Sequence, residues 1–546
     1  MMQHSNPSDS PPNSRKSKGI SAKPKDGVAF HALSMAFGTM TSRVLGLVRD
    51  MAFAAMFSRT VTDAWNVAFR LPNMFRRLLG EGSLSVSFIP VFVDARVQDP
   101  SGERARNLVN GFYTMLLVVL GVLTTLGIIF AEPVIRLLVE DNFDAIPGKF
   151  DLTVHMAQIM FGFIFLMSTY AYLMGILNAL GSFALPAMAP TFFNIAMIIA
   201  NFIPLGWQKI PGEALAWGVI VGGFLQTGAL VPSLIKKGYF PKIRWRGLSS
   251  DILRVWRNML PGMLGMGLLQ ITTIVNTNFA SRLGEGSNTY IYLADRLLEL
   301  PLSLVSVSLG TALLPTLAGL WSKGAKDNMV ETANYYLRLN LLIAIPAALG
   351  LYFLSMPIVQ LLFERGQFLT DDSMVTASVV QIYSLTLIVS SSVRVVVPSY
   401  YAIKNTWLPA VISAACLLLH ILIAPILMGQ FGIRGLVIST LLSAGLNLCT
   451  LMAFYPFFIG KFHFGKMFFS IGRYCLAGVG LILVCLCYEP IFHFFLNALS
   501  FGVFFSRLIS VILVISVSAV VYVLSCYFLK VDEIHHIFDS IKRRFN

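Results

Sequence analysis

The feature of this sequence that most constrains its fold is a nearly unbroken series of apolar runs, each about 20 residues long. A helix of that length crosses a bilayer, where only helices and closed barrels satisfy every backbone hydrogen bond. Hydrophobic residues make up 56% of the 546 residues, charged residues make up 12%, and the mean hydropathy is +0.72. The sequence therefore predicts an all-α polytopic membrane protein.

Glycines, prolines and charged clusters divide the chain into about 14 predicted transmembrane helices. They lie near residues 28–57, 61–94, 105–131, 152–180, 184–206, 213–235, 252–281, 288–320, 330–356, 373–403, 407–428, 434–458, 467–488 and 501–529. Residues 1–27 are rich in Ser, Pro and Lys, which predicts a disordered cytosolic tail, and residues 531–546 form a second polar tail.

The basic residues fix the expected orientation. Lys and Arg gather in every second loop, on the side that carries the N-terminal tail, as the positive-inside rule expects of cytoplasmic loops. Both termini are therefore predicted to be cytoplasmic. This distribution also accounts for the net charge of +14, so we expect no nucleic-acid partner.

Three short matches lie about 220–226 residues apart and suggest an internal repeat. The second span from Phe69 resembles the eighth from Ala294, and Leu185-Pro186-Ala187 resembles Leu408-Pro409-Ala410. The third match is Ala214-Leu215, with Gln226 further on, against Gly435-Leu436 and Asn447. The matches predict two pseudo-symmetric six-helix lobes related by an axis along the membrane normal, residues 28–240 and 241–460, followed by two helices over residues 461–530. The alternative is that membrane helices of similar composition resemble one another.

Ionisable residues are concentrated in four of the predicted spans. A charge at membrane depth costs roughly 2.5–3.5 kcal/mol on insertion scales, so these side chains are expected to face a cavity or a partner. Arginine exceeds carboxylate in the first two spans, and its planar guanidinium suits phosphate, which predicts an anionic, phosphate-bearing substrate. The residues are Arg43, Arg49, Asp50, Asp63, Arg70, Arg76, Arg77, Glu81, Asp295, Arg296, Glu299 and Arg394.

Helical spacing leaves their directions partly open. Arg49 lies about 120° around the helix from Arg43, so both reach one cavity only if it is wide or the helix bends. Pro72 is expected to interrupt the second span, so spacing does not decide between Arg76 and Arg77. Alternatively, these charges lie at the membrane interfaces or form structural ion pairs between helices.

Motifs of enzymes are absent from the sequence. It contains no GxxxxGK[ST] phosphate loop and no HExxH, so we expect neither an enzyme nor a cofactor or metal site. His155 and His420 lie in apolar segments and are interpreted as core residues rather than as proton relays.

Two groups of residues resemble the signatures of the MurJ (MviN) family of lipid II flippases. The second signature is similar to Ala294-Asp295-Arg296-Leu297 followed by Glu299-Leu300-Pro301. The N-terminal signature is similar to Ser42-Arg43-Val44-Leu45-Gly46-Leu47-Val48-Arg49-Asp50, Thr62-Asp63-Ala64, Leu71-Pro72-Asn73, Arg76-Arg77, Glu81-Gly82 and Phe88-Ile89-Pro90. With the span layout, the resemblance covers about residues 28–530.

The resemblance implies a MATE-like fold of the multidrug/oligosaccharidyl-lipid/polysaccharide exporter superfamily in the bacterial cytoplasmic (inner) membrane. It implies movement of lipid II (undecaprenyl-diphosphate-MurNAc-pentapeptide-GlcNAc) between leaflets for cell-wall biogenesis, with coupling to membrane potential or a monovalent ion. Membrane lipids and the cell-wall synthesis machinery are the other expected partners. The family's cavity charges match Arg43, Arg49, Arg76 and Arg296, supported by Asp63, Asp295 and Glu299, while Arg70, Arg77, Glu81 and Arg394 are secondary candidates.

Rival functions remain open from the sequence. They are a flippase for another polyprenyl-linked saccharide, a MATE-type drug/ion antiporter, an enzyme acting on polyprenyl phosphates, and a scaffold for cell-wall machinery. An exporter of organic cations should have an acidic cavity, and a scaffold leaves the arginines within the membrane unexplained.

Overall fold

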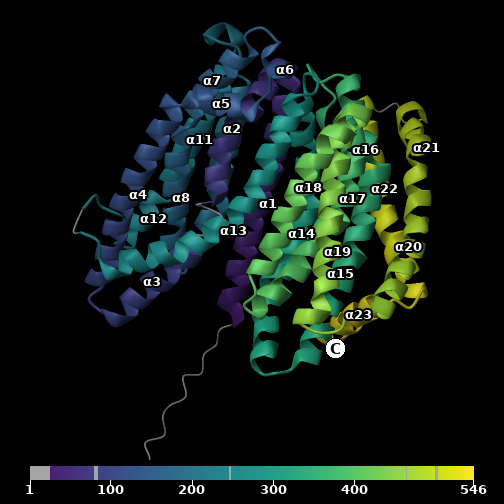
Figure 1. The fold of residues 1–546 in the computed structure, drawn as a ribbon. Coiled ribbons are helices and arrows are strands. Elements are labelled where there is room, and N and C mark those ends of the chain that lie inside the picture. The colour runs from purple at the N-terminus through teal and green to yellow at the C-terminus, as the bar shows by residue number, and fades with distance from the viewer. Residues whose placement is uncertain (1–24, 79–83, 245–246, 463, 499–501, 546) are drawn as a thin grey trace, which may run out of the picture.

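The computed structural model describes residues 25–78, 84–244, 247–462, 464–498 and 502–545, and this part of the chain is helical without a β-strand (Figure 1). Ten helical segments are long and apolar enough to cross a membrane: Glu103–Ile129, Lys149–Ala179, Ala184–Asn201, Glu213–Lys236, Lys326–Phe353, Thr370–Ala402, Trp407–Phe431, Ile433–Phe458, Phe464–Asn497 and Val503–Phe528. The predicted all-α, multi-pass class is confirmed.

The helices of the N-terminal half precede residue 240. They are α1 (Lys25–Met56), α2 (Arg59–Leu78), α3 (Leu84–Gln98), α4 (Glu103–Ile129), α5 (Ala131–Leu138), α6 (Asp141–Asp144), α7 (Lys149–Met160), α8 (Gly162–Ala179), α9 (Ala184–Met188), α10 (Pro190–Asn201), α11 (Glu213–Gly228) and α12 (Val231–Lys236).

The helices of the C-terminal half follow. They are α13 (Ser250–Ser281), α14 (Ser287–Ser322), α15 (Lys326–Phe353), α16 (Ser355–Phe363), α17 (Thr370–Ala402), α18 (Trp407–Phe431), α19 (Ile433–Phe458), α20 (Phe464–Leu486), α21 (Tyr488–His493), α22 (Val503–Phe528) and α23 (Asp532–Phe545).

Each predicted span coincides with a helix or a pair of consecutive helices. The four outside the ten apolar segments are α1, α2 with α3, α13 and α14, and each of them carries charged residues. The sequence did not predict the short helices α5, α6, α16 and α21, nor the amphipathic α23 within the C-terminal tail. Nearly all of the predicted N-terminal tail lies outside the described residues, although α1 already begins at Lys25.

The expected interruption at Pro72 is wrong, because α2 continues from Arg59 to Leu78 with Pro72 inside it. Proline is tolerated within membrane helices because neighbouring groups and small adjustments satisfy the freed backbone carbonyl. Pro72 is buried in the folded protein. The stripe that joins Asp63, Arg70 and Arg77 at heptad spacing therefore continues along one helix.

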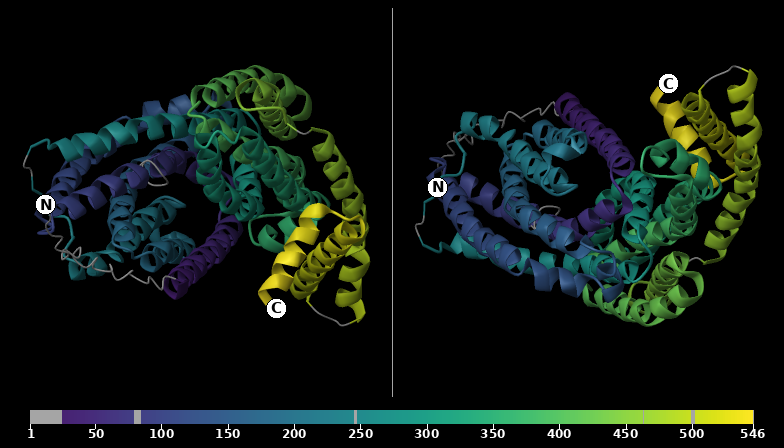
Figure 2. Two further views of the ribbon diagram at one scale, coloured as in Figure 1. Left: turned by 90° about the horizontal axis from the view of Figure 1, so that it is seen from below. Right: turned by 90° about the horizontal axis from the view of Figure 1, so that it is seen from above.

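Two large apolar clusters hold the helices together. The first contains buried residues from Phe53 to Met259, and the second contains buried residues from Leu313 to Ile534. A smaller cluster joins Ala54 at the end of α1 to residues of α14, α17 and α19. Figures 1 and 2 show the blue N-terminal helices and the green to yellow C-terminal helices on different sides of the molecule.

Helices α2 and α14 lie parallel, with corresponding positions in contact. Their side-chain contacts, from Thr60 with Glu285 to Arg77 with Glu299, join residues 222 to 227 positions apart. A nearly constant separation along both helices means that they run in the same direction and in register. The separation also matches the offset of the sequence repeat.

Candidate functional site

A cavity of about 750 Å³ lies between α1, α2, α8, α10 and α11 of the N-terminal half and α14 and α17 of the C-terminal half. Among the described residues, its charged lining consists of six arginines and two carboxylates, which are Arg43, Arg49, Arg76, Arg77, Arg296, Arg394, Asp50 and Glu299. Asn73, Tyr170, Asn194 and Gln226 add neutral polar groups. Arginine side chains therefore dominate the charge of this cavity.

Asp50 connects the arginines of the two halves. The Arg49 guanidinium donates to Asp50 Oδ1 through Nη2 at 2.7 Å and through Nε at 3.0 Å. Arg296 of α14 forms an ion pair with the other carboxylate oxygen, Nε to Oδ2 at 3.3 Å. The Tyr292 hydroxyl donates to Asp50 Oδ1 at 3.0 Å and accepts from Arg296 Nη2 at 3.1 Å. One buried carboxylate thus holds two guanidinium groups from helices far apart in sequence.

Glu299 forms a second junction, on the next turn of α14. It accepts from Arg296 Nη1 at 3.0 Å on one carboxylate oxygen and from Arg77 Nη2 at 3.2 Å on the other. Arg296 is therefore shared by Asp50 and Glu299. These contacts fix the planes of three guanidinium groups at the wall of the cavity.

The remaining arginines enter from three helices. Arg43 lies on α1, Arg394 lies near the end of α17, and Arg76 at the end of α2 donates through Nε to Asn73 Oδ1 at 2.9 Å. Arg43 and Arg49 line the same cavity although they point in different directions from α1. Asn194 fills the space beside Gly46, where it accepts from Arg49 Nη1 at 3.1 Å and donates to the Ser42 carbonyl oxygen at 2.8 Å.

The arrangement can bind an anion that enters the cavity. Six guanidinium groups with two carboxylates leave positive charge that is costly in a membrane unless an anion or water compensates it. Guanidinium groups bind phosphate oxygens through paired, charge-assisted hydrogen bonds. The geometry therefore suits a diphosphate or another polyanion.

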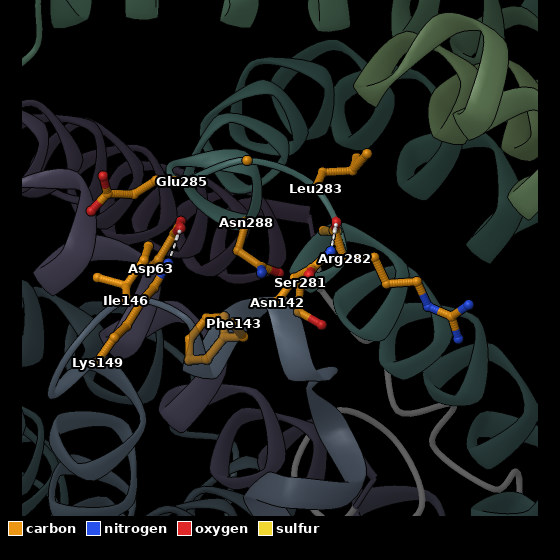
Figure 3. Close-up of a pocket in the computed structure, with 12 residues that line it drawn as sticks. Asp63, Asn142, Phe143, Ile146, Lys149, Ser281, Arg282, Leu283, Glu285 and Asn288 are labelled. Atoms are coloured by element: carbon orange, nitrogen blue, oxygen red, sulfur yellow. Dashed lines mark hydrogen bonds and ion pairs between the residues drawn. The ribbon is translucent and has the colours of Figure 1, made fainter.

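Asp63 lies outside this cavity, in a pocket beside α6 (Figure 3), and α6 is at the end of the molecule opposite the C-terminus (Figure 1). Its Oδ2 accepts from Lys149 Nζ at 3.0 Å and from the Gly286 backbone N–H at 2.7 Å. Its Oδ1 accepts from the Thr289 backbone N–H at 3.0 Å. Asp63 therefore caps the N-terminus of α14, where a negative charge is favoured.

Further contacts join the halves around Asp63. We call these contacts, together with those of Asp63 itself, the outer network. Arg59 pairs with Asp372 of α17 at 2.6 Å, Thr60 bonds to Glu285, and the Gln367 backbone N–H donates to the Ala55 carbonyl oxygen at 2.8 Å. Arg76 and Arg77 lie in the last turn of α2, whereas Asp63 lies near its start. The cavity is therefore closer than the outer network to the end of the molecule that carries the described termini, which we call the terminus side.

The other candidates lie apart from the cavity or outside the described residues. Asp295 and Arg70 line a separate chamber of about 190 Å³, together with Tyr383 and Asn276. Glu81 lies outside the described residues. The structure thus places Arg43, Arg49, Arg76, Arg296 and Glu299 in one cavity with Arg77 and Arg394, and it places Asp63 and Asp295 elsewhere.

Sequence reasoning did not select several residues that shape the cavity. Asp50 was visible as a charge within an apolar span, but its contact with Arg296 depends on the packing of α1 against α14. Asn194 and Tyr292 are neutral, and a neutral polar residue in a membrane helix gives little signal. Outside the cavity, Lys149 lies between two predicted spans in the sequence, yet it is buried against Asp63.

Solved structures define the class of the fold. A multidrug resistance MATE family transporter in an inward-facing conformation aligns with a TM-score of 0.65 at 15% identity, over 79% of this chain and 98% of its own. A structure described as lipid II flippase MurJ in an inward closed conformation aligns with a TM-score of 0.69 at 25% identity, over 90% of this chain and 98% of its own. The fold is therefore that of the MATE-like membrane transporters.

Sequence comparison identifies the family within this class. Residues 53–512 match the family described as lipid II flippase MurJ. A probable lipid II flippase MurJ of Bdellovibrio bacteriovorus is 49% identical over 458 residues, which cover 84% of this chain and 88% of that protein. A lipid II flippase MurJ of Burkholderia cenocepacia is 35% identical, over 77% of this chain and 82% of that protein. The chain belongs to the MurJ family of lipid II flippases.

Proposed function

We propose that this protein is a lipid II flippase, which moves the undecaprenyl-diphosphate-linked peptidoglycan precursor from the inner to the outer leaflet of the bacterial cytoplasmic membrane. Membership of the MurJ family supports this cargo. The observation that carries the proposal is the cavity with six arginines and two carboxylates between helices of a multi-pass membrane protein. The net positive charge of this cavity is opposite to the charge of a diphosphate.

The proposed roles of the charged residues follow from their positions. Arg43, Arg49, Arg76 and Arg296 hold the diphosphate, with Arg77 and Arg394 as further ligands in the same cavity. Glu299 orients Arg296 and Arg77, and Asp50 orients Arg49. Asp63 and Asp295 act outside the cavity, where they stabilise contacts of α14 with α2.

The proposed architecture has 14 transmembrane helices, in two six-helix lobes with two further helices at the C-terminus. Two large apolar clusters support separate lobes, the first of which also includes Ile252, Val255 and Met259 of α13. The in-register contact of α2 with α14 supports a pseudo-twofold axis that passes between the lobes. Both termini are proposed to be cytoplasmic. The start of α1 and the C-terminus lie at one end of the molecule in Figure 1, which supports this orientation.

Transport is proposed to proceed by alternating access, and the described conformation is the one that loads from the cytoplasm. The assignment of this conformation is supported by the outer network, which joins the halves on the side of the cavity opposite the terminus side. To open the cavity toward the outer leaflet, the contacts of the outer network must break while the halves close together on the terminus side. Membrane potential or a monovalent ion is proposed to supply the energy.

Of two rival transport functions, the first is tested together with lipid II, and the charge of the cavity argues against the second. A flippase for another polyprenyl-linked saccharide would need the same cationic cavity, whereas an exporter of organic cations would need an acidic one. We propose transport without chemical change of the cargo, as the family's function implies.

The experiment is a leaflet assay with purified protein in liposomes that contain lipid II, another undecaprenyl-diphosphate saccharide, or a polyprenyl alcohol without phosphate. The proposal expects movement of lipid II between leaflets, with its chemical structure unchanged, and no movement of the alcohol. Movement of the second saccharide alone, or cleavage of lipid II, would overturn it.

A further inference from the structure

The middle of the C-terminal half contains a buried imidazole that the cavity does not use. His420 lies on α18 with 1% of its surface exposed, and it contacts polar groups on two neighbouring helices. Its Nε2 donates to Asn276 Oδ1 on α13 at 2.8 Å, and its Nδ1 lies 3.1 Å from Ser439 Oγ on α19. Both ring nitrogens therefore have partners inside the bundle.

The Ser439 hydroxyl can satisfy His420 in either protonation state. A neutral imidazole that donates from Nε2 needs a donor at Nδ1, and the single Ser439 hydrogen can supply it. Ser439 Oγ also lies 2.7 Å from the Leu436 carbonyl oxygen, to which it can donate that hydrogen instead. The hydroxyl oxygen then accepts from a protonated Nδ1, so rotation of one hydroxyl accommodates an added proton.

We propose that His420 is a proton-binding site that couples proton uptake to the contact between the two halves of the protein. Histidine is the side chain whose ordinary charge change falls between about pH 5 and 8. The inference rests on the proposed function in one respect, since it names the ion that would drive the flippase. The site itself can be tested without lipid II.

A polar chamber connects His420 to the other half. Asn276, which accepts the His420 hydrogen bond, lines the 190 Å³ chamber together with Thr440 of α19. The same chamber holds Arg70 from α2 and Asp295 from α14. Arg70 Nε is buried and has no hydrogen-bond partner among the described residues. The chamber thus brings an arginine of the N-terminal half close to the histidine site.

Few other ionisable groups surround His420. Helix α18 carries only Cys416 besides it, and α19 carries Arg434 near its start with Cys449 and Tyr455 further along. Helix α13 carries Asp251, Arg254 and Arg257, all within its first turns, and α17 contributes Tyr383 to the chamber and carries Asp371, Asp372, Arg394, Tyr400 and Tyr401 elsewhere. Asp295 is the one carboxylate among the described residues that line the chamber.

Charge competition supplies the coupling. When His420 is neutral, the negative charge of Asp295 balances only the positive charge of Arg70. This attraction holds α2 against the C-terminal half. A proton on His420 adds a second cation beside the chamber, which weakens the attraction that holds Arg70 there. Protonation is therefore expected to loosen α2 from the C-terminal half and to favour an open outer network.

The test measures this opening directly in the full-length protein, without cargo. Spin labels are placed on Asp144→Cys and Asp371→Cys, which are exposed on the two halves at the outer end, after the exposed Cys449, Cys475 and Cys487 are replaced by alanine. Distance distributions are recorded by electron resonance from about pH 5 to about pH 8. His420→Gln removes the charge change, and His155→Gln is the matched control.

The proposal expects longer distances at low pH in the labelled parent and in His155→Gln, and a pH-independent distribution in His420→Gln. Ser439→Ala removes the acceptor for the protonated ring, so it should lower the midpoint by roughly one pH unit, which is a tenfold loss in proton affinity. An unchanged pH response in His420→Gln, or no response in the parent, would overturn the proposal. If His420→Gln does not fold, an unshifted midpoint in Ser439→Ala overturns it.

A lipid II leaflet assay on the same proteins separates the two proposals. A pH response that depends on His420, without movement of lipid II, would support the proton site and contradict the proposed function. Movement of lipid II at equal rates in His420→Gln and wild type, with or without a pH gradient, removes the coupling role alone.

Discussion

At the scale of single residues, Asp50 links the charges of the cavity. It is 3% exposed and holds Arg49 and Arg296, which come from the two halves of the chain. Removing one partner of a buried ion pair leaves the other charges uncompensated. We therefore expect Asp50→Asn to lower the free energy of unfolding by about 3–5 kcal/mol.

Thermal or denaturant unfolding in detergent measures this loss. Asp371→Asn is the control, because Asp371 is exposed at the start of α17 and its replacement should change stability by less than about 0.5 kcal/mol. Equal stability of Asp50→Asn and wild type would contradict the role given to Asp50.

Some residues of the cavity could be predicted because a charged residue inside an apolar run can be recognised from the sequence alone. Arg43, Arg49, Arg76 and Arg296 belong to this kind. The position of Asp63 was not predictable, because its partners Lys149 and Thr289 come from α7 and α14 and meet it only in the folded protein.

At the scale of elements, the contact between α2 and α14 is the part expected to move. Thr60 of α2 bonds to Glu285, which precedes α14, so a disulfide between Thr60→Cys and Glu285→Cys should lock the outer network closed. We expect oxidation to abolish movement of lipid II, and reduction to restore it.

The leaflet assay checks this prediction, and each single cysteine variant under the same oxidant is the control. All of these proteins carry the remaining natural cysteines unchanged, so oxidation of those thiols affects the controls equally. Full activity of the cross-linked protein would show that the outer network need not open.

Helix α23 makes a different kind of contact, at the terminus side. Buried Glu533 accepts from the Tyr474 hydroxyl of α20 at 2.9 Å and pairs with Arg338 of α15 at 3.0 Å. Glu533→Gln should release α23, and faster hydrogen exchange over residues 532–545 would measure it. Exposed Asp532→Asn is the neighbouring control, and equal exchange in both variants would contradict the role given to Glu533.

Long elements were predicted more completely than short ones. A run of 20 apolar residues identifies a membrane helix by itself, which is why every predicted span coincides with helical structure. Short helices such as α5 and α16 lie beside the spans and depend on tertiary packing, so periodicity over eight or nine residues did not distinguish them. The helix through Pro72 shows the same dependence on neighbours.

At the scale of the whole molecule, the proposed orientation follows from charge alone. Lys209 is exposed after α10 and Lys242 is exposed after α12, so the two lie on opposite sides of the membrane in the proposed topology. With the natural cysteines replaced, a membrane-impermeant thiol reagent on intact cells should label Lys209→Cys and leave Lys242→Cys unlabelled. The reverse pattern would invert the topology.

The two-lobe architecture could be proposed from sequence because a repeat leaves matches at a constant offset. The offset of about 220–226 residues is also the separation of residues that touch between α2 and α14. What the sequence did not contain was the relation in space of particular side chains of the two halves. The location of the cavity, and the separate chambers of Asp63 and Asp295, depend on that relation.

The central claim is that the head group of lipid II crosses the membrane through the arginine-lined cavity. The most direct test compares lipid II movement in liposomes that contain wild-type protein, Arg43→Ala, Arg296→Ala or Arg136→Ala, since Arg136 is exposed on α5 away from the cavity. We expect at least a tenfold loss of rate, or about 1.4 kcal/mol, for Arg43→Ala and Arg296→Ala, and full activity for Arg136→Ala. Wild-type rates in both cavity variants, with correctly folded protein, would contradict it.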